Sequence, residues 1–287
     1  MKNYFDSTQP ATLTTEPNGS IVTQLWRIAL LRNGKYDLNS GISSFSNVPI
    51  PLEYFEDASK RKQISLAYAD YLQDFLYFTQ HDSSVPKLEK AAIEGFGLCA
   101  DEFADNKHWP YEPYIRGGRR LAGLSTVTSK DIFLNRQKSD SVAIGSYRLD
   151  LKPGLFIYSD GDLFRDWAAF FKAPIYEIPF SAMLPRSGVR NLIASVSISS
   201  SPLAFSSLRM EIQFMALGQA AGIAAWVAVK ENKIFHRSMV TKIQSEQGRV
   251  GALIKIRDVC KLMSRGERLK EHFDARSCTP LSWPFTK

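Results

Sequence analysis

The chain has 287 residues, of which 44% are hydrophobic and 23% are charged, a composition typical of a globular protein with a sizeable core. Its net charge of +7 is spread along the chain, with the densest cluster at residues 60–62, so it lacks the basic patch or stripe expected of a nucleic-acid-binding protein. The three cysteines form no CxxC pair, which argues against a zinc site, an iron–sulfur cluster or any other metal site, and their odd, sparse count argues against a disulfide framework.

The N-terminal region predicts little regular structure. Residues 1–20 contain no apolar run of the kind found in a signal peptide, so we expect a cytoplasmic protein. Residues 1–57 are rich in Pro, Gly, Asn and Ser, which predicts loops and short strands with a turn at Asn33-Gly34.

Two helices are predicted next. Residues 59–80 carry apolar side chains at helical spacing, with Ser59 as the expected N-cap and the apolar stripe in a core. Pro86 is expected to begin a second helix over residues 87–97. The stripe of the first helix consists of Ile64, Ala67, Tyr68, Tyr71, Leu72, Phe75 and Leu76.

A polar and charged block over residues 98–137 separates these helices from two predicted strands. Residues 141–151 alternate enough to form one strand. Residues 175–180 predict a second, with Pro179 near a sheet edge or strand end, because proline cannot donate a ladder hydrogen bond.

The most informative segment is residues 191–229, NLIASVSISSSPLAFSSLRMEIQFMALGQAAGIAAWVAV. It predicts a buried strand over residues 192–198, a serine loop over residues 199–202 and a long apolar helix that opens near Ser206-Ser207. A strand that leads into a helix places backbone N–H groups where ligands collect in α/β sheets. Small residues on the helix would let another backbone or a flat cofactor approach closely.

Two readings of that helix are open. Residues 212–229 form an uncharged run that is long enough for a membrane span. Gln213 and Gln219, and the lack of a second candidate, favour a buried helix of a soluble protein. Beyond it, residues 233–287 are basic and partly helical, over about residues 238–247 and 252–263, and we expect their end to be loosely attached.

Four sequence blocks, in order, resemble the family of FAD-dependent oxidoreductases that includes xanthan-lyase-like and heterodisulfide-reductase-like flavoproteins. The first is GLCADEFADNKHW at residues 97–109, and the second is YIRGGRRLAG at residues 114–123. The third is SVAIGSYRLDL at residues 141–151, followed by YEIPFSAMLP. The fourth is residues 191–225, similar to the family's carboxy-terminal flavin-contacting segment.

The resemblance implies an α/β fold with an α+β substrate region, a mixed sheet and a buried C-terminal helix that contacts FAD. It implies a substrate-binding region over residues 1–185, a returning segment of the FAD-binding domain over residues 186–232, and a C-terminal extension over residues 233–287. The implied reaction is oxidation–reduction of a small molecule by hydride transfer at the flavin. The cofactor contacts it implies are Ser199, Ser200, Ser206, Arg209, Gly218, Gln219 and Gly222.

Candidate catalytic or substrate-binding residues come from the second and third blocks, because guanidinium groups bind carboxylates and other oxygen-rich groups well. They are Arg116, Arg119, Arg120, Tyr147 and Asp150. The alternative for the arginines is salt bridging to Asp101, Glu102 and Asp105, and the alternative for the serine loop is simple helix capping. We expect Arg209, a lone cation in an apolar helix, to be paired with a carboxylate or with the cofactor.

The departures from the family pattern are as informative as the matches. The chain contains no GxGxxG turn, the motif that holds the pyrophosphate of a dinucleotide. It therefore resembles the carboxy-terminal two-thirds of such a protein. Lys152 and Pro202 stand where the family often has histidine, which removes the commonest proton-transfer side chain from the expected site.

Three functions remain open from the sequence. The chain is a truncated oxidoreductase, a non-catalytic binding module or pseudoenzyme derived from that fold, or one half of an enzyme whose dinucleotide-binding half is a separate chain. Exposure of the apolar helix would favour self-association. No GxSxG elbow or catalytic-cysteine context supports a nucleophilic enzyme.

Overall fold

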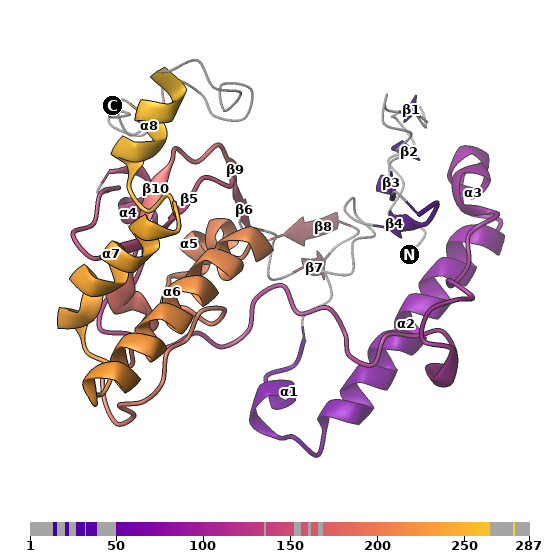
Figure 1. Ribbon diagram of the computed structural model, residues 1–287. Helices are drawn as coiled ribbons and strands as arrows, with labels where there is room; N and C mark the ends of the chain where they lie inside the picture. The colour runs from indigo at the N-terminus through magenta and orange to yellow at the C-terminus, as the bar shows by residue number, and fades with distance from the viewer. Residues whose placement is uncertain are drawn as a thin grey trace. The chain divides into compact units, whose positions relative to one another are not determined.

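The computed structural model describes residues 14–15, 21–22, 27–31, 33–38, 50–134, 136–151, 156–159, 162–165, 169–264 and 278 (Figure 1). The chain divides into two compact units, residues 1–116 with 152–167 and residues 117–151 with 168–287. The boundaries predicted at residues 185 and 232 follow a different division and stay a prediction.

The first unit combines an antiparallel meander with a helical pair. Its strands run in the order β1 (Thr14–Thr15), β2 (Ile21–Val22), β3 (Arg27–Leu30) and β4 (Tyr36–Leu38), and β7 (Phe156–Ser159) pairs with β8 (Asp162–Arg165). Its helices are α1 (Glu53–Glu56), α2 (Arg61–His81), α3 (Lys87–Ile93) and the short 3₁₀ turn η3 (Ala104–Asn106). Its core is Ile28, Ala92 and Ile93, packed against Phe75 and Leu76 of α2.

The apolar stripe of α2 is only partly a core stripe. Tyr68 is buried, and Phe75 and Leu76 pack against the core as predicted. Tyr71 is 38% exposed, so the prediction is wrong there. Ser59 is not the N-cap, because α2 begins at Arg61 and the Ser59 hydroxyl donates to the Asp57 carboxylate at 2.5 Å.

The second unit is a mixed helix and sheet structure, which confirms the α/β class, although its sheets are small and antiparallel. Strands β5 (Ser141–Gly145) and β10 (Tyr176–Pro179) pair with each other, as do β6 (Leu149–Leu151) and β9 (Ala169–Phe171). The helices α6 and α7 pack against each other and against β5, and α5 packs against β6. The remaining elements are α4 (Ser129–Phe133), η4 (Phe180–Met183), α5 (Pro202–Leu208), α6 (Glu211–Glu231), η5 (Arg237–Met239), α7 (Val240–Arg249) and α8 (Ile256–Ser264).

The strand predicted over residues 141–151 is two strands with different partners. Gly145 ends β5 opposite Tyr176. A Cβ at Gly145 would lie 2.4 Å from Nε2 of Gln213 and 2.5 Å from Cζ of Tyr176, so the chain passes two large side chains here. It then turns through residues 146–148 before β6 pairs with β9. Pro179 stands at the end of β10, where the register shifts, as its missing N–H predicts.

The segment predicted as strand, loop and one helix differs in two respects. Residues 192–198 form no strand, although the N–H of Leu121 donates to the carbonyl of Ser197 at 2.8 Å and Ile198 is buried. The helix is interrupted, because Met210 adopts an extended conformation between α5 and α6. Ser201 caps α5 by accepting from the N–H of Ala204 at 3.2 Å.

Helix α6 buries one face and exposes the other, which differs from the fully buried helix that its apolar sequence predicts. The buried side includes Leu217, Ala220, Ala224 and Val227. In the described part of the chain it is the one helix long and apolar enough to cross a membrane, judged by length and composition, and 33% of that window is buried.

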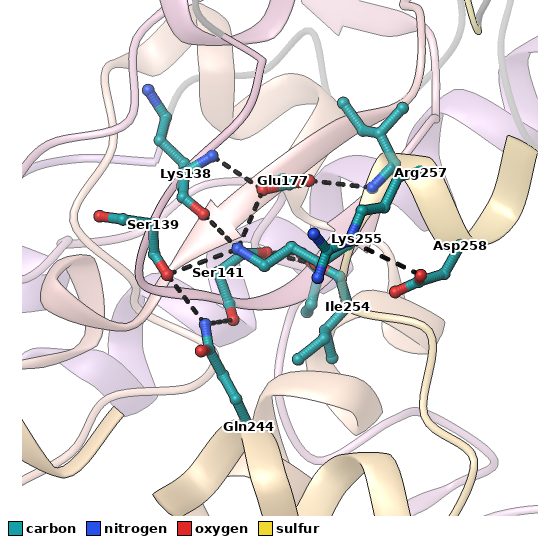
Figure 2. A network of polar contacts seen from close by, with 11 residues as sticks. Lys138, Ser139, Ser141, Glu177, Gln244, Ile254, Lys255, Arg257 and Asp258 are labelled. Atoms are coloured by element: carbon teal, nitrogen blue, oxygen red, sulfur yellow. Dashed lines mark hydrogen bonds and ion pairs between the residues drawn. The ribbon is translucent and has the colours of Figure 1, made fainter. Parts of the chain in front are cut away.

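The predicted C-terminal helices are observed as α7 and α8, and a buried carboxylate anchors the start of α8 to the sheet (Figure 2). Glu177 on β10 accepts from the N–H groups of Lys138 at 2.8 Å and Ile256 at 2.9 Å, and from Nζ of Lys255 at 3.4 Å. From α7, Gln244 donates to the carbonyls of Ser139 and Ser141 in the same network (Figure 2).

A disulfide joins Cys260 on α8 to Cys278, which corrects the expectation drawn from the cysteine count. Both cysteines pack against a small core that includes Ile175, Ile256 and Val259. The sequence alone does not predict which cysteines pair, since three cysteines allow more than one pairing. The predicted loose end, residues 265–287 apart from Cys278, lies outside the described residues.

Candidate functional site

Three segments of the second unit, each from a different sequence block, meet around the short helix α5, which belongs to the third of them. They are residues 117–123, residues 147–150 and residues 199–209. Several of the residues singled out from the sequence lie in these segments, and the contacts below connect them.

Arg120 holds the first segment to the serine loop. Its Nε donates to the carbonyl of Ser200 at 2.9 Å, and its guanidinium lies 5.5 Å from the ring centre of Phe205 on α5. Burial lowers the pKa of Arg120. Arg119 is exposed beside it. Nη1 of Arg120 also donates to the carbonyl of Gly118, at 3.4 Å. An arginine has five N–H donors, so Arg120 still has further N–H groups to offer a ligand.

Gly123, the last residue of the YIRGGRRLAG block, is required by close packing. A Cβ there would lie 2.6 Å from Cβ of Ser199 and 2.9 Å from the carbonyl oxygen of Ser125. These distances are shorter than a Cβ tolerates, so the glycine lets the first segment lie directly against the serine loop.

An ion pair joins β6 to the chain after α5. Nη2 of Arg209 lies 2.7 Å from Oδ2 of Asp150, and their side chains are 12% and 14% exposed. The N–H of Asp150 donates to the hydroxyl of Ser206 at 3.2 Å. The expectation that Arg209 is paired is confirmed, with a carboxylate as a partner.

A buried polar network that the sequence did not reveal lies behind this pair. The Ser207 hydroxyl donates to the carbonyl of Tyr147 and lies 2.8 Å from the hydroxyl of Tyr176, which is 3.3 Å from the side-chain amide of Gln213. Burial raises the pKa of Tyr176, so this network stays neutral. The adjacent Ser206 and Ser207 indicated polar contacts near the helix, but nothing in the sequence indicated that Tyr176 takes part in them.

The serine hydroxyls face the protein. Ser199, Ser200 and Ser206 are 2%, 7% and 4% exposed. The hydroxyl of Ser199 lies 3.0 Å from that of Thr126, and that of Ser206 donates to the carbonyl of Leu203 at 2.7 Å. Backbone groups and arginines, not serine hydroxyls, are therefore what this loop can present to a ligand.

Arg116 is the last residue of the first unit, directly before residues 117–123. Three other candidates are not brought into the cluster. Gly218, Gln219 and Gly222 lie farther along α6 on its exposed face, where a Cβ at either glycine would meet nothing within 4 Å.

The acidic residues proposed as partners of the arginines have other partners. Asp101 and Glu102 pair with Lys35, and Asp105 accepts from the hydroxyl of Tyr111. His108, expected to be a hydrogen-bonded histidine, has Nδ1 3.1 Å from the carbonyl oxygen of Glu102.

Of the two positions where the family often has histidine, only one lies in the described part of the chain, and its proline side chain cannot carry a proton. Pro202 is the first residue of α5, and Lys152 lies outside the described residues. Among the residues that the structure describes, no group of three or more His, Cys, Asp and Glu side chains could hold a metal ion.

The comparison with protein families covers the whole of this cluster. Residues 3–247 match the model described as FAD dependent oxidoreductase. Searches of curated proteins and of solved structures returned no match. Because the matched span is most of the 287 residues and includes all three segments around α5, the chain belongs to the FAD dependent oxidoreductase family, whose cofactor is FAD.

Proposed function

We propose that the chain takes part in FAD-dependent oxidation–reduction of a small molecule, with the ring end of the cofactor at the cluster around α5. Membership of the family gives the general function. The observation that supports this location is that residues 117–123 and 147–150 both contact residues 199–209, the segment that contains α5. Residues from three separate blocks meet there.

The donors of the cluster suit the flavin ring. The pyrimidine edge of the ring carries carbonyl oxygens and ring nitrogens, which accept from guanidinium and backbone N–H groups. Arg120 and Arg209 supply the guanidinium groups. The first N–H groups of α6, from Glu211 onward, have no partner within the helix. The exposed Glu211 carboxylate opposes negative charge there, so we assign the ring to the side of Arg209.

When bound, FAD supplies the electron-accepting chemistry. The residues of the chain position it: the Asp150–Arg209 ion pair fixes the orientation of one guanidinium, and Phe205 with the Ser200 carbonyl fixes that of Arg120. Arg119, exposed beside Arg120, is proposed to meet an anionic or oxygen-rich substrate, with Tyr147 and Asp150 on the same side. The substrate itself is not assigned.

The pyrophosphate group of FAD needs a binding site in addition to this cluster. The sequence contains no GxGxxG motif, which holds that group in dinucleotide-binding folds. We propose that a dinucleotide-binding part outside these 287 residues takes this role. The cofactor contacts suggested at Gly218, Gln219 and Gly222 remain a prediction.

A non-catalytic binding module is the second candidate. Pro202 at the first position of α5 and the inward-facing serine hydroxyls favour it, because neither can transfer a proton to a ligand. Such a module would keep the fold of the second unit without retaining FAD.

The test compares FAD binding, followed by quenching of flavin fluorescence, in two double variants. Asp150→Asn with Arg209→Gln keeps a neutral hydrogen-bonding pair but removes the cation, and we expect FAD affinity to fall at least about tenfold. Glu246→Gln with Arg249→Gln removes an exposed pair of the same kind on α7, joined at 3.2 Å, and should leave affinity unchanged.

Equal affinities in the two variants would refute the assignment of the ring to the Arg209 side. A wild-type chain without measurable affinity would mean that the cluster does not hold FAD without a dinucleotide-binding part, and a chain that also fails to bind FAD when that part is supplied would favour the binding module.

A further inference from the structure

One face of α6 is apolar and exposed along the whole helix. Four large side chains recur on it at intervals of three, eleven and three residues, which keeps them on one side of an α-helix. Their exposed fractions are high for apolar residues: Ile212 81%, Met215 72%, Trp226 50% and Val229 83%. These side chains form two exposed apolar pairs, one toward each end of the helix, with Gln219 and small residues between them. Exposed apolar surface of this extent marks an interaction site.

The order of residues on this face is nearly the same in both directions. Counted from the middle of α6, between Ala220 and Ala221, Ile212 and Val229 are equally distant from the centre, and so are Met215 and Trp226. Gln219 and Gly222 flank the centre. An isologous dimer interface needs such self-complementarity. In it, a residue i of one copy contacts residue j of the other copy, and residue j of the first contacts residue i of the second.

We propose that two copies of this chain associate through α6, with the two helices antiparallel across a two-fold axis at the helix centre. Large side chains then meet large ones at both ends, and the small residues of both copies meet in the middle. Ile212 faces the partner's Val229, and Met215 faces the partner's Trp226. This face contains Gly218, Gln219 and Gly222, so a dimer formed through it excludes the FAD contacts predicted from the sequence at those residues, and the proposal goes beyond the proposed function.

The charges at the ends of the face select the antiparallel direction. Glu211 begins α6 and Lys230 lies in its last turn, and both are exposed. They are equally distant from the helix centre. Antiparallel pairing places each Glu211 beside the partner's Lys230, twice per dimer. Parallel pairing would place like charges together at both ends, which is unfavourable.

The glycines of α6 allow the helices to approach closely. A Cβ at Gly218 or at Gly222 would meet nothing within 4 Å in this chain, so neither glycine is needed for packing within the unit. Without side chains there, the two backbones can come together at the centre while the larger side chains interlock on either side. A crossing angle of about 20° keeps both helix ends in contact.

The size of the interface sets its expected strength. The exposed part of α6 spans about 28 Å between Glu211 and Lys230 at 1.5 Å per residue. One helix pair is at or below the low end of stable interfaces, which bury about 1,200–2,000 Å². We therefore expect a dimer that dissociates on dilution, measurable by sedimentation equilibrium.

The decisive test is a charge exchange. Glu211→Lys and Lys230→Glu each turn two attractive pairs into two repulsive ones, and each should weaken dimerisation by about tenfold. The double variant restores opposite charges and should return the dissociation constant to within about threefold of the wild type. Effects on the helix dipole accumulate in the double variant, so they cannot produce this recovery.

Controls separate the interface from folding and from FAD. Lys261→Glu makes the same charge change in the last turn of α8 and should leave dimerisation unchanged. Circular dichroism checks that each variant is folded. The measurement is made with and without FAD, so a chain that fails to bind FAD still tests the proposal.

Four results would overturn it. The first is a monomer at every concentration, and the second is a dimer that the single exchanges leave intact. The third is a double exchange that does not recover. The fourth is a monomer that floats with phosphatidylcholine vesicles, or one that associates only with a separate dinucleotide-binding chain.

Discussion

Two glycines of the second unit are fixed by contact with neighbouring side chains and not by unusual backbone angles. A Cβ at Gly145 would lie 2.5 Å from the ring of Tyr176, and one at Gly123 would lie 2.6 Å from Cβ of Ser199. Neither belongs to the residues with positive φ. Both glycines therefore lie where the sequence blocks that resemble the family pack against one another.

At this scale we predict that Gly145→Ala destabilises the chain by about 1–3 kcal/mol, because the added methyl group must displace Tyr176 or Gln213 in a packed core. The matched control is Gly248→Ala on α7, where a Cβ meets nothing within 4 Å and a helix gains about 0.5–1 kcal/mol. Urea denaturation measures both. A Gly145→Ala variant as stable as the wild type would show that the core around Tyr176 is loosely packed.

At the scale of elements, Glu177 attaches the start of α8 to the sheet. Its carboxylate is 3% exposed and receives hydrogen bonds from residues 138, 255 and 256 (Figure 2). A buried carboxylate with several donors is stabilising only while those donors stay in place.

We predict that Glu177→Gln lowers the free energy of unfolding of α8 by about 2 kcal/mol, because the amide loses the charge and one acceptor atom. Hydrogen exchange of the amides of α8 should accelerate by about thirtyfold if α8 opens locally. Arg257→Gln, at a side chain that is 75% exposed on the same helix, is the control and should leave exchange unchanged. Equal protection in both variants would mean that the disulfide and the apolar contacts hold α8 without Glu177.

The elements also show what the sequence could predict. Helix α2 and strands β5 and β10 lie where periodicity places them, because each buries an apolar face set by local spacing. The break at Met210 and the irregular course of residues 192–198 depend on partners distant in the chain. The Asp150–Arg209 pair joins residues 59 apart. Contacts of that kind explain why the resemblance named both residues but only the fold brought them together.

For the whole molecule, the family match gives FAD as the cofactor, and our proposal places the ring of FAD at the cluster around α5. The second unit contains the arginines, the serine loop and the apolar helix, and its buried core extends from Val127 to Ile243. That core is large enough to keep the cluster in shape. We therefore expect the ring end of FAD to be recognised by this chain alone.

The visible absorption spectrum of the purified chain, taken after incubation with FAD and desalting, tests this expectation most directly. We predict that flavin bands at about 370 and 450 nm remain with the protein and shift from those of FAD in solution, because the ring would lie against arginine and backbone donors. A colourless protein after desalting would contradict it, and would mean that the cluster around α5 does not hold FAD without a dinucleotide-binding partner.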